Sequence, residues 1–173
     1  MRRARVLSAV GGAILLALAA TPAQASPDIP SGTDQCDSSV DHLGDWYSLT
    51  DEKSHHGRNI ELHTGSVRDA YAVSRIEDVE RGDKLWIDRS FGKFEMKTGE
   101  GGTHPSNADV ERTGGWKQCG PFTATWLDDL AGWAVTDGVY LQASDTHSYA
   151  VRACMRPADS DDSECTDWFV DHL

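Results

Sequence analysis

The chain has 173 residues, of which 28 are acidic and 16 are Lys or Arg, so its formal net charge is −12 at pH 7. A surface this acidic repels phosphate backbones and anionic lipids, so the composition argues against nucleic acids and membrane surfaces as partners. Basic protein surfaces are better candidates, and the charge serves solubility equally well.

The first 25 residues resemble a secretion signal. Residues 1–5 contain three arginines, residues 6–20 form an apolar run, and Ala23-Gln24-Ala25 supplies a cleavage site with small residues. The apolar run is short for a bilayer span, which favours a cleaved leader over a membrane anchor. We therefore expect cleavage after Ala25 and a secreted, extracellular protein.

Cleavage there would leave residues 26–173, a length that suits one domain with a hydrophobic core. It would remove three arginines and no acid, which leaves 13 basic and 28 acidic side chains and a net charge of −15. We expect a single β-domain over residues 36–173, preceded by an arm.

The arm is residues 26–35, which are rich in Pro, Ser, Gly and Asp. This composition predicts a flexible segment. Its simplest role is a remnant left by leader cleavage. In the alternative role it pairs with a partner protein as an extended strand, and Asp28, Ile29 and Pro30 would then make the contact.

Four cysteines follow the leader, and an even number in a secreted chain predicts two disulfides. Four cysteines allow three pairings. A local bridge between Cys154 and Cys165 across a hairpin is the simplest, and it leaves Cys36 to pair with Cys119. A zinc site is the rival interpretation, but no C-x-x-C or paired histidine spacing supports it.

Short runs of alternating apolar and polar residues predict a series of strands, at residues 46–49, 59–63, 69–76, 82–90, 93–98, 122–127, 138–143, 148–155 and 165–170. The clearest is 82–90, in which Leu85 and Ile87 share one face and Trp86 lies on the other. No helix of ordinary length is needed. The pattern predicts an all-β fold, a single antiparallel β-sandwich or barrel-like domain.

The segments between these strands are predicted as turns or loops. Residues 51–57 are expected to form a polar turn, and residues 91–93 a hairpin turn that brings 93–98 back along 82–90. Residues 128–133 are expected to form a turn or a short helix. Residues 99–115 hold five glycines and few apolar side chains, so we expect a long loop that is either functional or disordered.

No catalytic or metal site stands out. His55, His56 and His63 are close in sequence, but His56 and His63 are seven residues apart across a predicted turn, with no third ligand at a spacing typical of zinc. We therefore interpret them as solvated turn histidines and expect no metal and no cofactor. The cysteines are expected to be bridged, and no G-x-S-x-G motif is present. Paired carboxylates of a glycoside hydrolase stay open because acids are so numerous. We expect a protein that is not an enzyme.

The tryptophans are the more informative surplus, and some must lie in the core: Trp46, Trp86, Trp116, Trp126, Trp133 and Trp168. Trp86 is the candidate for an exposed contact, because it lies opposite Leu85 and Ile87. An exposed aromatic at this position would bind a protein surface or a sugar.

Several motifs resemble those of a known group of proteins. They are Ile60-Glu61-Leu62, Arg75-Ile76, the 82–90 strand, Val151-Arg152-Ala153-Cys154 and Cys165-Thr166-Asp167-Trp168-Phe169. Together they are similar to small secreted actinobacterial proteins, some of which resemble the adaptor subunit of umbrella toxin particles.

The resemblance implies a non-catalytic protein-binding β-domain whose N-terminal arm reaches into a partner. The partners would be other secreted proteins of an extracellular assembly, here an antibacterial toxin particle. The alternatives are an extracellular hydrolase, a hydrolase inhibitor or a carbohydrate-binding module.

Overall fold

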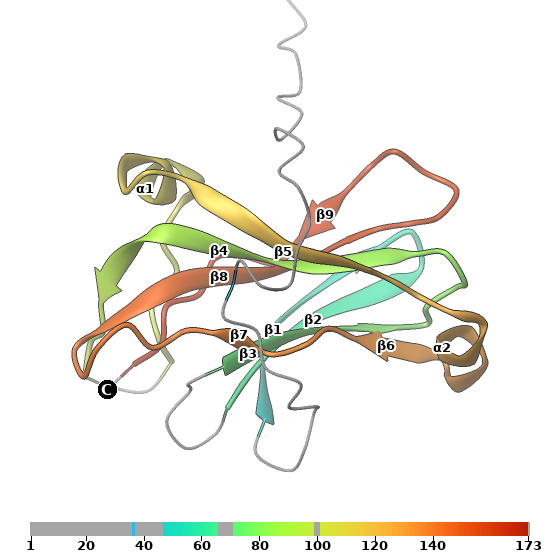
Figure 1. Cartoon of the computed structure of the whole chain (residues 1–173), viewed down its shortest axis with the longest axis horizontal. Coiled ribbons are helices and arrows are strands. Elements are labelled where there is room, and N and C mark those ends of the chain that lie inside the picture. The colour runs from blue at the N-terminus through green and yellow to red at the C-terminus, as the bar shows by residue number, and fades with distance from the viewer. Residues whose placement is uncertain (1–35, 37–46, 66–70, 99–100, 173) are drawn as a thin grey trace, which may run out of the picture.

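A computed structural model describes residue 36 and residues 47–65, 71–98 and 101–172. The expected leader and the arm, with Asp28, Ile29 and Pro30, lie outside the described residues. The described part is built from two antiparallel sheets that face each other, with two short helices at opposite ends (Figure 1). This confirms the predicted all-β class.

The first sheet has five strands in the order β1-β2-β3-β6, with β7 also paired to β3. Their bounds are β1 Tyr47–His55, β2 Arg58–Gly65, β3 Tyr71–Glu77, β6 Trp133–Val135 and β7 Val139–Tyr140. Just beyond β7, the Tyr149 amide donates to the Leu141 carbonyl. The 139–143 segment therefore connects the first sheet to β8 of the second.

The second sheet has the order β5-β4-β8-β9. Its strands are β5 Trp116–Thr123, β4 Lys84–Glu95, β8 His147–Arg156 and β9 Glu164–Cys165, and the helices are α1 Asn107–Arg112 and α2 Trp126–Ala131. β4 and β8 pair along most of their length and form the centre of this sheet.

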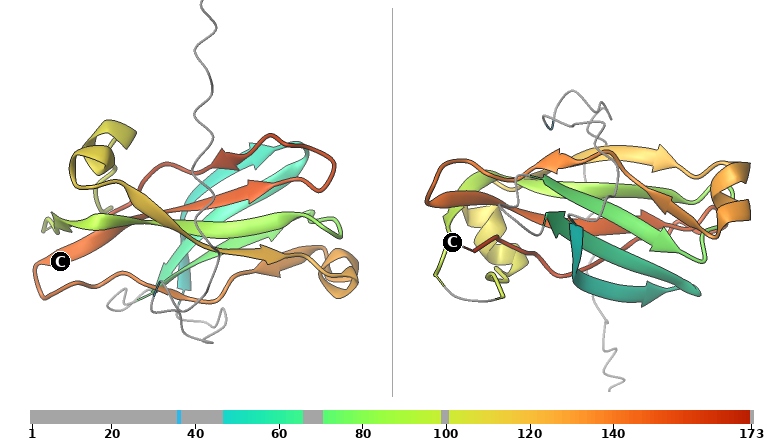
Figure 2. Two further views of the ribbon diagram at one scale, coloured as in Figure 1. Left: turned by 45° about the horizontal axis from the view of Figure 1, so that its top comes forward. Right: turned by 90° about the horizontal axis from the view of Figure 1, so that it is seen from below.

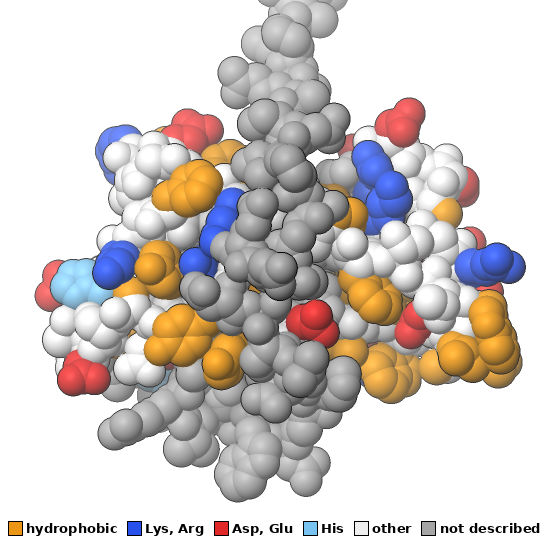
Figure 3. Space-filling model, in the orientation of Figure 1, with side chains coloured by type: hydrophobic (Ala, Val, Ile, Leu, Met, Phe, Trp, Pro, Cys, Tyr) orange, Lys and Arg blue, Asp and Glu red, His pale blue; other side chains and the backbone are white. Residues whose placement is uncertain are grey.

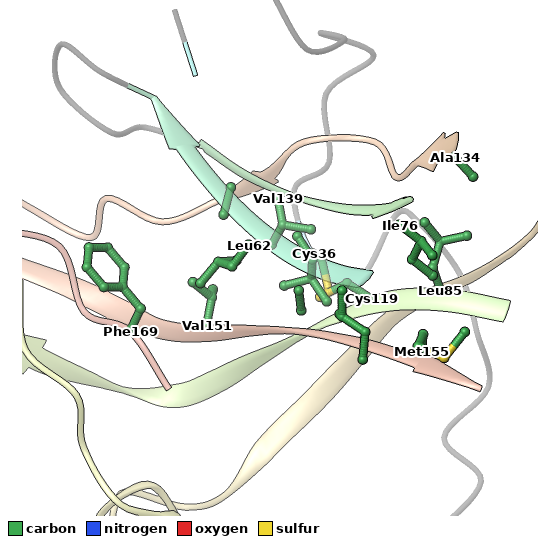
Figure 4. Close-up of a cluster of buried hydrophobic side chains, with 14 of the residues drawn as sticks. Cys36, Leu62, Ile76, Leu85, Cys119, Ala134, Val139, Val151, Met155 and Phe169 are labelled. Atoms are coloured by element: carbon green, nitrogen blue, oxygen red, sulfur yellow. A yellow bond between two sulfur atoms is a disulfide. The ribbon is translucent and has the colours of Figure 1, made fainter. Parts of the chain in front are cut away.

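The main core lies between the sheets. Ile60, Leu62 and Ile76 of the first sheet pack in one cluster with Leu85, Ile87, Val151 and Met155 of the second, all fully buried (Figure 4). These positions alternate along their strands, as the period of two in the sequence predicts.

A second apolar cluster covers the outer face of the second sheet. Val110 of α1 packs there with Ala150, Trp168 and Val170, and all four are buried. Ser106 and the side chain of Asp109 form a capping box that begins α1. The described part of the 99–115 loop, from residue 101 onward, is thus an ordered cover for the sheet.

Two of the predicted turns are wrong. Residues 51–55 continue β1, and the turn shrinks to His56 and Gly57, whose φ angles are 48° and 79°. β4 runs on through residues 91–93 to Glu95 without reversing, and residues 93–95 pair with β8. Gly92 resembles a turn residue but serves a close approach, because an added Cβ would lie 2.2 Å from Cβ of Thr113.

The predicted strand at 122–127 is also displaced. β5 ends at Thr123, and the following residues form α2. The short helix expected at 128–133 therefore begins earlier, at Trp126.

Both predicted disulfides are confirmed. Cys36 pairs with Cys119 of β5, and Cys154 of β8 pairs with Cys165 of the neighbouring strand β9. The first bridge ties residue 36 to the outermost strand of the second sheet. No described cysteine is free.

Candidate functional site

The most exposed apolar group of the described residues is on α2. Trp126, Leu127 and Leu130 are 60, 56 and 78% exposed, and no residue of this helix is buried. A surface helix normally buries its apolar stripe against the core of its own domain. α2 leaves that stripe in water, which is the pattern expected of a binding surface.

Capping interactions at both ends stabilise α2. The Thr125 hydroxyl accepts from the Leu127 amide, and Asp128 Oδ2 accepts from the backbone and hydroxyl of Thr125 at 2.7 and 2.6 Å. Gly132 ends the helix in the left-handed conformation at φ 78°. These caps satisfy the terminal backbone groups of a helix that is too short to be stable alone.

α2 lies at one end of the sandwich and joins the outer strands β5 and β6 of the two sheets (Figure 2). Phe122 near the end of β5 and Trp133 at the start of β6 are also partly exposed. We call Phe122, α2 and Trp133 together the α2 surface. Figure 3 shows apolar side chains gathered at this end of the molecule.

A small pocket lies beside the α2 surface. Its volume is about 100 Å³, and its lining includes Phe122, Pro121, Thr136, Asp137 and Val139. Sites for drug-sized ligands are several times larger. The pocket suits a single side chain of a partner better than a free small molecule.

Acidic side chains outnumber basic ones around the α2 surface, although Lys84 pairs across the sheet with Thr123, next to Phe122. Asp128 and Asp129 lie in the first turn of α2, which has no basic residue in its last turn, and Asp137 lines the pocket. Arg75 is a cation close by, with its guanidinium 5.7 Å from the Trp133 ring, but it also pairs with Glu61 and Glu77. An apolar patch with an acidic border favours a partner with basic residues around an apolar site.

Trp86 lies on the face of β4 that the sequence predicted, but it is only 9% exposed. Its indole N–H donates to Asp88, and it pairs across the sheet with Cys154. Little of its surface is therefore available to a partner. A binding role for Trp86 stays a prediction, and its burial argues against that role. Among the tryptophans that the structure describes, the well-exposed ones are Trp126 and Trp133.

The same outer face holds a buried ion pair. Asp88 Oδ2 accepts from Nε and Nη2 of Arg152 at 3.0 and 2.8 Å. The guanidinium also lies over the rings of Trp168 and Trp116 and donates to Asn107. Burial raises the pKa of the Asp88 carboxyl, against the opposite effects of Arg152 and the Trp86 N–H.

Every group in this cluster is committed to another part of the fold. Asn107 Oδ1 also accepts from the Trp168 indole, so the ion pair, both tryptophans and α1 form one network. Such a network holds α1 on the sheet and leaves no group aimed at a ligand. We interpret it as structural.

The three histidines separate into two places. His63 lies 2.8 Å from Glu61 on β2, whereas His55 and His56 lie at the β1–β2 turn with Asp162 near both. Asp162 could not be predicted as their neighbour from the sequence, because it comes from the distant loop between β8 and β9. Asp88, Cys154 and Cys165 also lie together, but these cysteines are bridged.

Comparison of the chain with protein-family models, with curated proteins and with solved structures found no match. Within the described ranges, no helix is both long and apolar enough to cross a membrane.

Proposed function

We propose that the protein is a secreted, non-catalytic protein-binding module that docks through the α2 surface onto a basic-bordered apolar site of another secreted protein. The observation that carries the proposal is the exposure of Trp126, Leu127 and Leu130 on a capped helix that buries none of its side chains. A few residues supply most of the binding energy at protein interfaces, and aromatic side chains such as Trp126 are enriched among them.

The rigid support of α2 adds to this argument. Its caps and its short connections to β5 and β6 fix the helix before a partner arrives. Little conformational entropy is then lost when the anchors are buried, which strengthens binding. The acidic border and the net charge of −12 favour a basic partner and disfavour a second copy of this chain.

In its more specific form the proposal is an adaptor subunit of an extracellular antibacterial toxin particle. The resemblance of the β4 and β8–β9 motifs to secreted actinobacterial proteins supports this role. An adaptor has two binding surfaces, and the α2 surface is a candidate for one of them. The arm with Asp28, Ile29 and Pro30 is the candidate for the other.

The test compares two double variants as bait in medium from the producing cells. Leu127→Glu/Leu130→Glu removes two apolar anchors from α2, and Leu49→Glu/Phe91→Glu removes two other apolar side chains that are each at least half exposed. Captured proteins are identified by mass spectrometry and their affinities are measured with purified material. We expect a specific partner whose affinity falls about tenfold or more in the α2 double variant only.

Three outcomes would overturn the proposal. Equal capture by the α2 variant and the wild type would remove the α2 surface from consideration. A dimer in sedimentation that only the α2 variant disrupts would make this surface a contact between copies. Recovery of the wild-type protein alone, under conditions that preserve complexes, would count against a binding module.

A carbohydrate-binding module is the second candidate, because Trp126 and Trp133 offer exposed indole rings for stacking on sugars. Glycan-array binding that Trp126→Ala abolishes would favour it over protein docking.

A further inference from the structure

His55, His56 and Asp162 bring three metal-ligating groups to one point. Asp162 Oδ2 lies 3.9 Å from Nε2 of His55 and 3.8 Å from Nε2 of His56, and the ligand atoms all lie within 4.8 Å of one another. In Figure 1 the β8–β9 loop approaches the tip of the β1–β2 hairpin, where these residues meet. These elements do not belong to the α2 surface.

His55 is the unusual member of the group. Its side chain is only 10% exposed, and its Nε2 is buried without a hydrogen-bond partner. A buried polar nitrogen without a partner is costly, so native structures rarely keep one. The atom points toward Asp162 and His56 but lies too far from the carboxylate for a hydrogen bond. A metal ion between them would satisfy it.

The turn conformation explains how two successive histidines converge. Side chains of neighbouring residues in a strand point to opposite faces. His56 leaves the strand with φ 48°, and its ring then lies edge to face with that of His55, with centroids 4.4 Å apart. The left-handed conformation at His56 therefore places its imidazole on the same side of the hairpin as that of His55.

A buried ion pair connects the β1–β2 hairpin, which carries both histidines, to the β8–β9 loop, which carries Asp162. Arg58 donates to the carboxylate of Asp83, which is fully buried, and its Nη1 donates to the His56 carbonyl at 2.8 Å. Asp83 Oδ1 also accepts from the Ala158 amide at 2.9 Å, at the start of the loop that carries Asp162. One carboxylate thus positions both the hairpin and the loop.

The far end of the loop is fixed as well. The Cys154–Cys165 disulfide closes it, and Lys53 of β1 pairs with Glu164 at 2.5 Å. The Asp162 amide donates to the Ser160 hydroxyl within the loop. Support of this kind from outside the ligand set is what orients the ligands of protein metal sites.

We propose that His55, His56 and Asp162 bind a divalent transition-metal ion, with Zn²⁺ as the best fit. Two imidazoles and one carboxylate are a ligand set that zinc accepts, with bonds of about 2.0–2.2 Å. Tetrahedral ligands at that distance lie about 3.3 Å apart, so each nitrogen-to-oxygen separation here needs to close by about 0.5 Å.

The ion would clamp the β1–β2 hairpin to the β8–β9 loop. His56 and Asp162 are half-exposed or more, so the fourth position faces solvent. Water or a ligand from another molecule would occupy it. The exposed side of the site also lets the ion enter without opening the core.

The test titrates the purified full-length protein, free of any polyhistidine tag, with Zn²⁺ by calorimetry and with Co²⁺ by visible absorption. His56→Asn keeps a residue that tolerates the left-handed turn, and Asp162→Asn keeps the shape of an exposed side chain. The control Asp145→Asn/His147→Gln changes the same residue types on the exposed β7–β8 hairpin. Circular dichroism checks that every variant is folded.

We expect one ion per chain, the intense visible bands of four-coordinate Co²⁺, and affinity about tenfold or more weaker in His56→Asn and in Asp162→Asn. The control should bind as the wild type does. His55→Gln tests the buried ligand and should also weaken binding. Absence of saturable binding at millimolar metal would overturn the proposal, as would equal affinity in His56→Asn, Asp162→Asn and the wild type.

Discussion

Replacing Arg152 with methionine removes the cation that pairs with Asp88 on the outer face of the second sheet. Methionine keeps an unbranched apolar side chain between the rings of Trp116 and Trp168, so the change isolates the charge. Removing one partner of a buried ion pair costs about 3–5 kcal/mol, because the other charge is left without compensation. We expect the free energy of unfolding at pH 7 to fall by about that amount.

The loss should depend on pH in a direction that the burial of Asp88 sets. Burial already raises the pKa of this carboxyl, and without Arg152 the pKa rises further. In the folded variant, the Asp88 carboxyl then keeps its proton up to a pH at which the same carboxyl in the unfolded chain has already lost it. Its stability is therefore greatest below the unfolded pKa and falls as pH rises toward the folded pKa, by at most about 1.4 kcal/mol per pH unit.

Urea denaturation between pH 4 and pH 8, with the disulfides intact, measures this directly. The deficit of Arg152→Met against the wild type should be small near pH 4 and grow toward pH 7. Adding Asp88→Asn should restore much of the stability, since the amide oxygen still accepts from the Trp86 N–H. Arg112→Met, which breaks an exposed pair with Asp109, should leave stability nearly unchanged.

An Arg152→Met deficit that is the same at every pH would contradict the expected protonation of Asp88 in the variant. A loss below about 1 kcal/mol at pH 7 would contradict the expected cost of breaking a buried pair, because the pair would then behave like a surface pair.

Three other changes have expected outcomes. The double replacement Cys36→Ser/Cys119→Ser should lower the free energy of unfolding by about 4–5 kcal/mol in urea denaturation, because the bridge closes a loop with a sequence separation of 83. A urea midpoint equal to that of the wild type would show that opening the bridge adds no conformational entropy to the unfolded chain. Gly92→Ala should cost about 1–3 kcal/mol, since its Cβ would collide with Thr113, and a stability equal to the wild type would contradict the close approach. Leu130→Glu should leave the melting temperature within about two degrees of the wild type, because the side chain touches no core, and a large drop would mean that α2 packs on the fold.

The central strands and both disulfides could be predicted from the sequence. Alternation along residues 59–63 and 82–90 reports burial on one face, which is a local property of a strand. The Cys154–Cys165 pair is local too, and it leaves one partner for Cys36. These inferences rest on local sequence patterns and on the number of cysteines, and they require no knowledge of contacts between distant residues.

The features that were missed all depend on such contacts. Gly92 looks like a turn residue because the sequence does not show that Thr113 will approach it. The loop that carries α1 is poor in apolar residues, yet Val110 packs on the sheet and Asn107 accepts from Arg152 and Trp168. The apolar stripe of α2 has the pattern of a buried helix, and only the fold shows that it stays in water.

The candidate sites also combine features that the sequence shows locally with contacts that only the fold creates. His55 and His56 were visible as a pair, but Asp162 reaches them only through the β8–β9 loop. Trp86 has the alternation of an exposed residue on a two-layer sandwich. In the structure Trp86 is buried beside Asp88 and Cys154, which alternation along a single strand does not show.

The cover on both faces of β4 has a consequence for local opening. Residues 85–90 are all buried, so their amides should exchange with deuterium only when the whole domain unfolds. The amides of α2 lie in a short helix with no buried residue and should exchange through local opening, much faster than those of β4. A partner that binds α2 would therefore slow exchange in that helix at first contact, whereas β4 would respond only to the added global stability.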